Sequence, residues 1–238
     1  MLNNHVWRPG LDIYICVCPR RLWIGCRARP GYSFSRSRGH RVVNVDLPCE
    51  RAQSTLDDYA NAVAQAVTGT TGPRIIVGHS VGGATIPLAA ARLSADRLVF
   101  VAAIVPEPGK SIYETTGPAT RAAMEHVTID HGDGTRSFDF DALSTLAPPE
   151  ERDAYLNFLR ATQRRQGWLA ITQPWPGAGI PDVPRNYILC TEDAVIPPGQ
   201  QRIFAAALGV TPIEIDSVHS VFSAKPRELA SILASLAA

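Results

Sequence analysis

Short, uninterrupted apolar runs alternate along the chain with longer alanine-rich segments. The runs are rich in β-branched residues and four to seven residues long, as is typical of strands covered on both faces. They span residues 13–17, 41–45, 74–77, 97–103, 186–190 and 212–215. Helical patterns lie between them, at residues 56–67, 81–93, 199–208 and 226–236. Strands that alternate with helices predict an α/β fold with a doubly wound, mostly parallel sheet.

Residues 109–184 interrupt this alternation. They hold a hairpin-like segment at 127–140, a mixed helical pattern at 149–166 and a Pro/Gly/Trp-rich loop at 173–184. An aromatic-rich excursion of this length between two strands predicts a cap over one end of the sheet, although packing within the cap is the plainer role of each aromatic side chain. We therefore expect three parts: an atypical N-terminal segment (1–38) that includes the first core strand, a core (39–108 and 185–238) and a cap insertion (109–184).

Composition limits the class of protein. The chain has 238 residues, of which 45% are hydrophobic and 19% charged, with a net charge of +1, as expected for a globular protein of one or two domains. The longest apolar run, residues 98–105, is far shorter than the ~20 residues that span a bilayer. The apolar stretch at 11–18 carries Asp12 and lacks a small-residue cleavage site, so it does not resemble a secretory signal. We expect a cytoplasmic protein without a membrane partner.

The cysteines and the N-terminal arginines suggest two other functions, and neither is favoured. Five cysteines are an odd number that fits a reducing compartment, and the spacing of Cys16, Cys18 and Cys26 matches no zinc site, so we expect no metal. Residues 1–41 hold eight arginines and one acid, a charge of +7 that leaves −6 on the remainder. Because these arginines form no helical stripe and the aromatics among them have no regular interval, we expect no nucleic-acid partner.

The most informative motif is Gly78-His79-Ser80-Val81-Gly82, which fits Gly-x-Ser-x-Gly between a predicted strand and a predicted helix. A sharp turn there would hold Ser80 in a strained conformation, and the flanking glycines would remove side chains that collide with neighbouring elements. The serine would then lie at a helix N-terminus, where the Val81 amide can donate to an oxyanion. A phosphate-binding turn is the alternative, but the lysine and the glycine spacing of such loops are absent.

A serine hydroxyl needs a base and a group that orients the base. In this topology the acid and the histidine should follow the serine, each after a late strand. Asp193 follows the strand that ends at 190, and His219 follows the strand that ends at 215. Glu192 and Asp216 are the neighbouring acids that could be mistaken for the orienting carboxylate, and loop position favours Asp193. The other histidines are expected in surface, packing or turn-shaping roles: His5, His40, His79, His126 and His131.

The chain from about residue 39 to its end resembles the α/β-hydrolase fold, and within it the small cofactor-independent esterases that include plant methylesterases, hydroxynitrile lyases and their bacterial relatives. The matching stretches are residues 38–48, 78–83, 98–106, 189–193, 196–197 and His219. The resemblance implies Ser80 as nucleophile, Asp193 as orienting acid, His219 as base and no cofactor. It further implies hydrolysis of a small carboxylic ester through an acyl-enzyme.

Two alternatives stay open at this point. Lyases of this group usually carry lysine directly after the catalytic histidine, whereas Ser220 follows His219 here, so hydrolysis is favoured over lyase activity. A non-catalytic, ligand-binding homologue is the second alternative. A homodimer is compatible with the sequence.

One departure from the family pattern concerns the oxyanion loop. Such enzymes follow the first core strand with His-Gly, and the usual spacing places Pro19-Arg20-Arg21 there instead. The chain has 21 arginines and 2 lysines, which suggests a GC-rich gene. With such codons, Pro-Arg-Arg-Leu reads as His-Gly-Ala one base later, so a local frameshift between about residues 18 and 38 would explain both the missing loop and the excess of arginine. Sequencing the locus tests this hypothesis, and a natural divergent loop is its rival.

Overall fold

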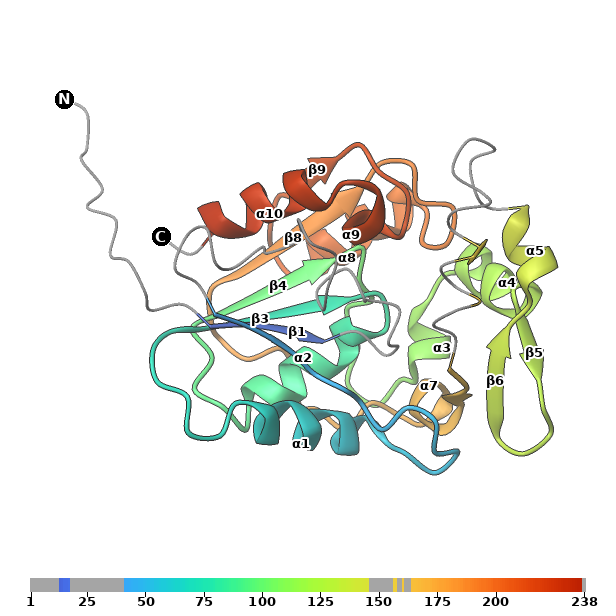
Figure 1. The fold of residues 1–238 in the computed structure, drawn as a ribbon, viewed down its shortest axis with the longest axis horizontal. Coiled ribbons are helices and arrows are strands. Elements are labelled where there is room, and N and C mark those ends of the chain that lie inside the picture. The colour runs from blue at the N-terminus through green and yellow to red at the C-terminus, as the bar shows by residue number, and fades with distance from the viewer. Residues whose placement is uncertain (1–12, 18–40, 146–155, 158–159, 161–163, 237–238) are drawn as a thin grey trace.

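A computed structural model describes residues 13–17, 41–145, 156–157, 160 and 164–236 of the chain. Its centre is a six-stranded sheet in the order β2-β1-β3-β4-β8-β9, in which every neighbouring pair is parallel (Figure 1). The strands are β1 (Ile13–Val17), β2 (Arg41–Asn44), β3 (Arg74–His79), β4 (Arg97–Val101), β8 (Arg185–Cys190) and β9 (Ile213–Ile215). This is the predicted fold class, and each predicted strand is present within two residues at either end.

Both faces of the sheet are buried, which explains the uninterrupted apolar runs. Consecutive strand residues point to opposite faces. Accordingly, Ile76 belongs to one hydrophobic cluster while its neighbours Ile75 and Val77 belong to another. Leu98 and Phe100 join the first cluster, on the opposite side from the one that β9 and the C-terminal helix complete. A strand that is buried on both faces has no solvent-exposed side, so its sequence shows no alternation of apolar and polar residues.

Among the described residues, five helices accompany this sheet, and they divide between its two faces. They are α1 (Leu56–Ala66), α2 (Gly82–Ala90), α8 (Pro198–Ala207), α9 (Val221–Ala224) and α10 (Pro226–Ser235). Residues of α1, α2 and α8 pack in the first cluster, and residues of α9 and α10 pack in the second. Figure 1 shows α1 and α2 below the sheet and α10 above it. A capping box between Thr55 and Asp58 begins α1.

The segment between β4 and β8 forms a second, smaller region. It contains α3 (Ile112–Thr115), α4 (Pro118–His126), α5 (Phe140–Ser144) and α7 (Leu169–Thr172). A three-stranded antiparallel sheet joins β5 (Thr128–Asp130), β6 (Thr135–Phe138) and β7 (Gln166–Gly167) in that order. In Figure 1 the arrows of β3 and β4 point toward the side on which α4, α5 and the β5–β6 hairpin lie.

The sequence expectations for this second region hold in part. The predicted hairpin is present as β5 and β6, with Gly132 and Gly134 at positive φ in its turn. The predicted mixed helix at 149–166 lies largely outside the described residues, but its last residue, Gln166, belongs to strand β7 rather than to a helix. The reason is that Gln166 and Gly167 pair with β6 and with the loop after β2, where the Gly167 amide donates to Cys49 O at 2.6 Å.

Several expectations fall on parts of the chain that are not described. They are the arginine-rich segment and the missing oxyanion loop at Pro19-Arg20-Arg21, together with His5 and His40. Over the described residues, no helix has both the length and the apolar character required to cross a bilayer.

Candidate active site

The turn between β3 and α2 presents Ser80 in a strained backbone conformation. Ser80 has a φ of +55°, in the left-handed region that a side chain rarely adopts. Hydrogen bonds hold it there, because its amide donates to Val101 O at 3.3 Å and its carbonyl accepts from Gly83 and Ile104 at 3.1 and 3.0 Å. The turn thus has the strand–serine–helix form that the motif predicts.

Two glycines make this turn sterically feasible. A Cβ at Gly78 would lie 2.8 Å from the carbonyl oxygen of Gly82, and one at Gly83 would lie 2.3 Å from that of Ile104. Both distances are shorter than nonbonded contacts allow. The close approach of α2 to β3 and to the segment after β4 therefore requires glycine at both positions.

The turn lies where a parallel sheet forms its binding crevice. The chain passes from β1 to the edge strand β2 on one side and then to β3 on the other, so the strand order reverses between β1 and β3. Ligands of open α/β sheets bind beyond the carboxyl ends of the strands at such a point. Ser80 directly follows β3 and occupies this position.

The structure brings the other two predicted side chains to Ser80. His219 Nε2 lies 3.1 Å from Ser80 Oγ, and His219 Nδ1 lies 2.7 Å from Asp193 Oδ2. His219 follows β9 and Asp193 follows β8, so the carboxyl ends of three parallel strands supply the three side chains. The Asp193 side chain is fully buried, and that of His219 is 14% exposed.

The chemistry of the partners sets the direction of these hydrogen bonds. A carboxylate only accepts, so the neutral imidazole donates from Nδ1 to Asp193. Nε2 is then an acceptor, and the Ser80 hydroxyl donates its hydrogen bond to it. A base in this tautomer, with the hydroxyl already bonded to it, can take that proton when the oxygen attacks an electrophile.

Asp193 is held from both of its oxygens. Oδ1 accepts the backbone amides of Val195 and Ile196, each at 2.8 Å. Oδ2 accepts the Gln201 side-chain amide at 3.0 Å in addition to His219. Four N–H donors therefore satisfy this buried carboxylate, which would otherwise be costly to hold as an ion.

His79, the residue before the serine, contacts His219 rather than solvent. Its Nε2 lies 2.9 Å from the His219 carbonyl oxygen, and the two rings lie 4.7 Å apart between centroids. Burial, together with the neighbouring His219, lowers the pKa of His79 to about 3. The ring is therefore neutral near pH 7, and it donates from Nε2 to that carbonyl. Its contact with the main chain of residue 219 is a feature of the candidate site that the sequence did not indicate.

The remaining candidates lie elsewhere. Glu192 and Asp216 are exposed, and Asp216 accepts from Thr191 Oγ1 at 3.0 Å, so the structure places neither of these acids where Asp193 lies. His126 is exposed at the end of α4, and His131 contacts Ser137 Oγ at 2.8 Å. Val81 is the N-cap residue of α2, the position from which an amide donor to an oxyanion is expected.

Thiols and metals add nothing to this site within the described residues. Cys49 and Cys190 are buried there, and burial raises the pKa of the Cys190 thiol. No group of three His, Cys, Asp or Glu side chains in the described ranges could hold a metal ion.

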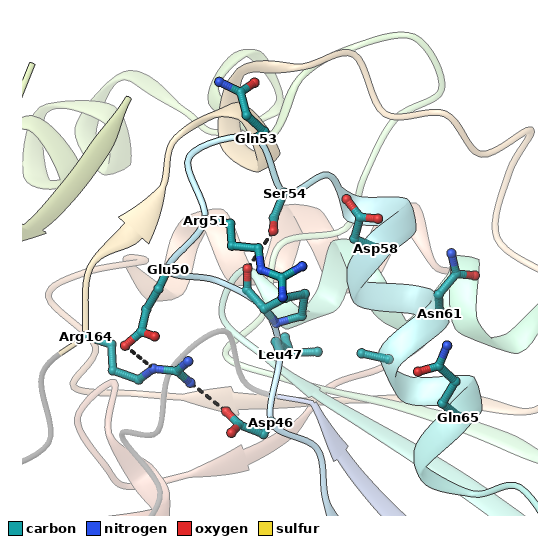
Figure 2. A pocket seen from close by; sticks show the side chains of 12 residues that line it. Asp46, Leu47, Glu50, Arg51, Gln53, Ser54, Asp58, Asn61, Gln65 and Arg164 are labelled. Atoms are coloured by element: carbon teal, nitrogen blue, oxygen red, sulfur yellow. Dashed lines mark hydrogen bonds and ion pairs between the residues drawn. The ribbon is translucent and has the colours of Figure 1, made fainter. Parts of the chain in front are cut away.

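A separate hollow of about 710 Å³ lies between α1 and the loop after β2 (Figure 2). Arg164 crosses one side of it and bonds Glu50 and Asp46, each at 2.6 Å. Acidic, basic and amide side chains all face this hollow, so it shows no preference for one sign of charge. Ser80, Asp193 and His219 are not among its lining residues.

Fold and site together define an α/β hydrolase, and the comparison with known families agrees. Residues 18–232 match the alpha/beta hydrolase family, and the chain belongs to it. Among curated proteins, it is 23% identical to methylesterase 3 of Arabidopsis thaliana over 90% of this chain and 91% of that protein. It is 26% identical to a pyrethroid hydrolase of Sphingobium wenxiniae, over 84% and 79%.

Solved structures show the same fold. An extracellular alpha/beta-hydrolase from a Paenibacillus species superposes with a TM-score of 0.77 and 18% identity, over 95% of this chain and 98% of that one. A pyrethroid hydrolase from Sphingobium faniae superposes with a TM-score of 0.75 and 21% identity, over 97% and 98%. Together with these structures, the family match and the curated relatives confirm the resemblance to the esterase group that the sequence motifs indicate.

Proposed function

We propose that this chain is a serine esterase that cleaves small carboxylic esters through an acyl-enzyme. Ser80 is the nucleophile, His219 the general base and Asp193 the orienting acid. The observation that carries this proposal is the continuous hydrogen-bonded line from Ser80 Oγ through both ring nitrogens of His219 to Asp193 Oδ2, with distances of 3.1 and 2.7 Å. Relatives named as methylesterases and a pyrethroid hydrolase support the ester as the substrate class.

The reaction follows from the geometry. As Ser80 Oγ bonds to the ester carbonyl carbon, His219 Nε2 takes the hydroxyl proton, and the carbonyl oxygen becomes an oxyanion. The Val81 amide, at the N-terminus of α2, is the proposed donor to that oxyanion. His219 then gives the proton to the leaving alcohol oxygen as its bond to the carbonyl carbon breaks. A water activated by the same base releases the acid and restores the serine.

The buried Asp193 holds His219 in the tautomer that this cycle needs. With Nδ1 donating to the carboxylate, Nε2 stays free to accept, and the imidazolium that forms lies beside a negative charge. The insertion between β4 and β8 is the proposed cap, which would exclude water and select the substrate.

Ester hydrolysis by the full chain tests this function. The substrates are a p-nitrophenyl ester series from acetate to octanoate and simple methyl esters, with acid release followed directly. We expect Ser80→Ala to lower the rate by about 10³-fold or more. Ser94→Ala, an exposed serine in the turn after α2, is the matched control and should retain the rate. Equal hydrolysis by Ser80→Ala and by the unaltered chain would overturn the proposal.

A further inference from the structure

The side chain of Gln201 is buried next to Asp193, on the side away from Ser80 in the hydrogen-bonded line Ser80–His219–Asp193. Gln201 is fully buried in α8, where it lies on one stripe with the buried positions 204 and 205 and with the buried C-cap residue 208. The other three positions on that stripe are apolar. Burying a primary amide among apolar side chains costs free energy unless its polar atoms form hydrogen bonds. The hydrogen-bond partners of Gln201 therefore indicate why an amide occupies this position.

Every polar atom of the Gln201 side chain is used. Oε1 accepts the Cys190 amide at 3.0 Å. Nε2 lies 2.7 Å from Ile196 O, 3.0 Å from Asp193 Oδ2 and 3.3 Å from Cys190 O. The amide therefore closes the loop from Cys190 to Ile196 around Asp193. It also donates to the same carboxylate oxygen that His219 contacts.

We propose that Gln201 is a positioning residue that fixes Asp193 against His219 and shares the negative charge of the oxygen that both contact. The inference rests on the proposed function and deepens it, since it assigns to a residue remote from Ser80 a part in setting the strength of the base. A hydrogen bond to a carboxylate disperses its charge. Asp193 therefore stabilises the imidazolium form of His219 less when the Gln201 amide is present than when it is absent.

Among the described residues, the ionisable neighbours of Asp193 and His219 are either neutral near pH 7 or exposed to solvent. Tyr187 and Cys190 lie on β8 next to Asp193, and burial raises the pKa of each, so both are neutral near pH 7. His79 packs against His219 and is neutral as well. Glu192 and Asp216, in the loops that carry Asp193 and His219, are exposed to solvent. Within the described part of the chain, the side chains that bond Asp193 are thus His219 and the buried amide of Gln201.

The test compares Gln201→Met with Gln200→Met in the full chain. Methionine keeps the length of the side chain and removes the donor. Gln200 is the neighbour in α8 whose side chain lies beside Gly117 of the insertion, so its replacement controls for a change in helix composition. Without the amide, the full negative charge of Asp193 stabilises the imidazolium form of His219. We therefore expect Gln201→Met to raise the midpoint of the acid limb of the kcat/KM pH profile by about 0.5–1 pH unit. KM should hardly change, and Gln200→Met should leave the midpoint in place.

A second measurement on the unaltered chain needs neither substrate nor a variant that folds. In an NMR titration, the Gln201 side-chain amide resonance should shift with the same midpoint as the His219 ring, because both contact Asp193 Oδ2. A resonance that does not move with the ring would overturn the proposal. So would an acid limb in Gln201→Met that is unmoved or moves downward, even with a lowered kcat, since that is the result of a merely structural role. If the unaltered chain hydrolyses no ester, the proposed function fails, and the titration still decides the role of Gln201.

Discussion

Acidification should destabilise this protein through His79, and replacement of His79 by glutamine isolates the effect. Burial, together with the neighbouring His219, lowers the pKa of the folded-state imidazole from 6.5 to about 3. Because the folded pKa lies below the unfolded one, the unfolded chain binds a proton that the folded chain excludes. The stability due to neutral His79 is therefore complete above pH 6.5 and is lost as the pH falls from 6.5 toward 3.

The size of the effect follows from that interval. A pH of 4.5 is two units below the pKa of the imidazole in the unfolded chain, where the ring is protonated, while the imidazole in the folded chain is still neutral. At 1.36 kcal/mol per unit, the free energy of unfolding should fall by about 2.5 kcal/mol between pH 7.5 and pH 4.5 on account of this residue. His79→Gln binds no proton and retains an N–H donor for the His219 carbonyl, so this part of the pH dependence should vanish in the variant.

Urea unfolding at the two pH values measures the difference. The unaltered chain should lose about 2–3 kcal/mol more than His79→Gln between pH 7.5 and pH 4.5. The two proteins differ at this one residue, so the difference between their losses reports the contribution of His79. Parallel losses in the two proteins would show that His79 accepts a proton in the folded state. The description of its ring as a buried neutral donor would then be wrong.

Three further substitutions test separate parts of the site. Gly83→Ala places a Cβ 2.3 Å from Ile104 O and should destabilise the chain by about 2 kcal/mol or more in urea unfolding; an unchanged midpoint would contradict the close approach of α2. Tyr187→Phe leaves the buried Ala103 amide and carbonyl without the phenol that lies 3.0 and 2.7 Å from them, and should cost about 1–3 kcal/mol by the same assay; a neutral result would mean that water replaces it. Asp193→Asn should lower kcat/KM by about 10³- to 10⁴-fold through the wrong imidazole tautomer; a loss below tenfold would remove Asp193 from its assigned role.

The sheet was predictable because its strands have two buried faces. A parallel strand between two helical layers has no polar side, so its apolar run marks it plainly, as at β4 and β8. The short elements of the insertion, such as α3 and α7, span one turn each and leave no period to read. Strand β7 depends on pairing with β6, a contact between segments about thirty residues apart that no local pattern records.

The Ser80, Asp193 and His219 candidates followed from topology, because each residue lies in the turn or loop just after a strand whose end lies on one edge of the sheet. The supporting residues were harder to find. His79 contacts a carbonyl 140 positions away in the sequence. Gln201 did carry a signal, since it is a polar residue on the apolar stripe of α8, and a buried stripe position occupied by an amide indicates a bonded partner in the core.

The central claim is that His219 activates Ser80 as a nucleophile, and the rate and location of fluorophosphonate labelling test it most directly. The full chain and His219→Ala are incubated with the probe, and the adduct is located by peptide mass mapping. We expect a single adduct on Ser80 that forms at least about 10²-fold more slowly in His219→Ala. An adduct on another residue, or equal rates in the two proteins, would contradict the account.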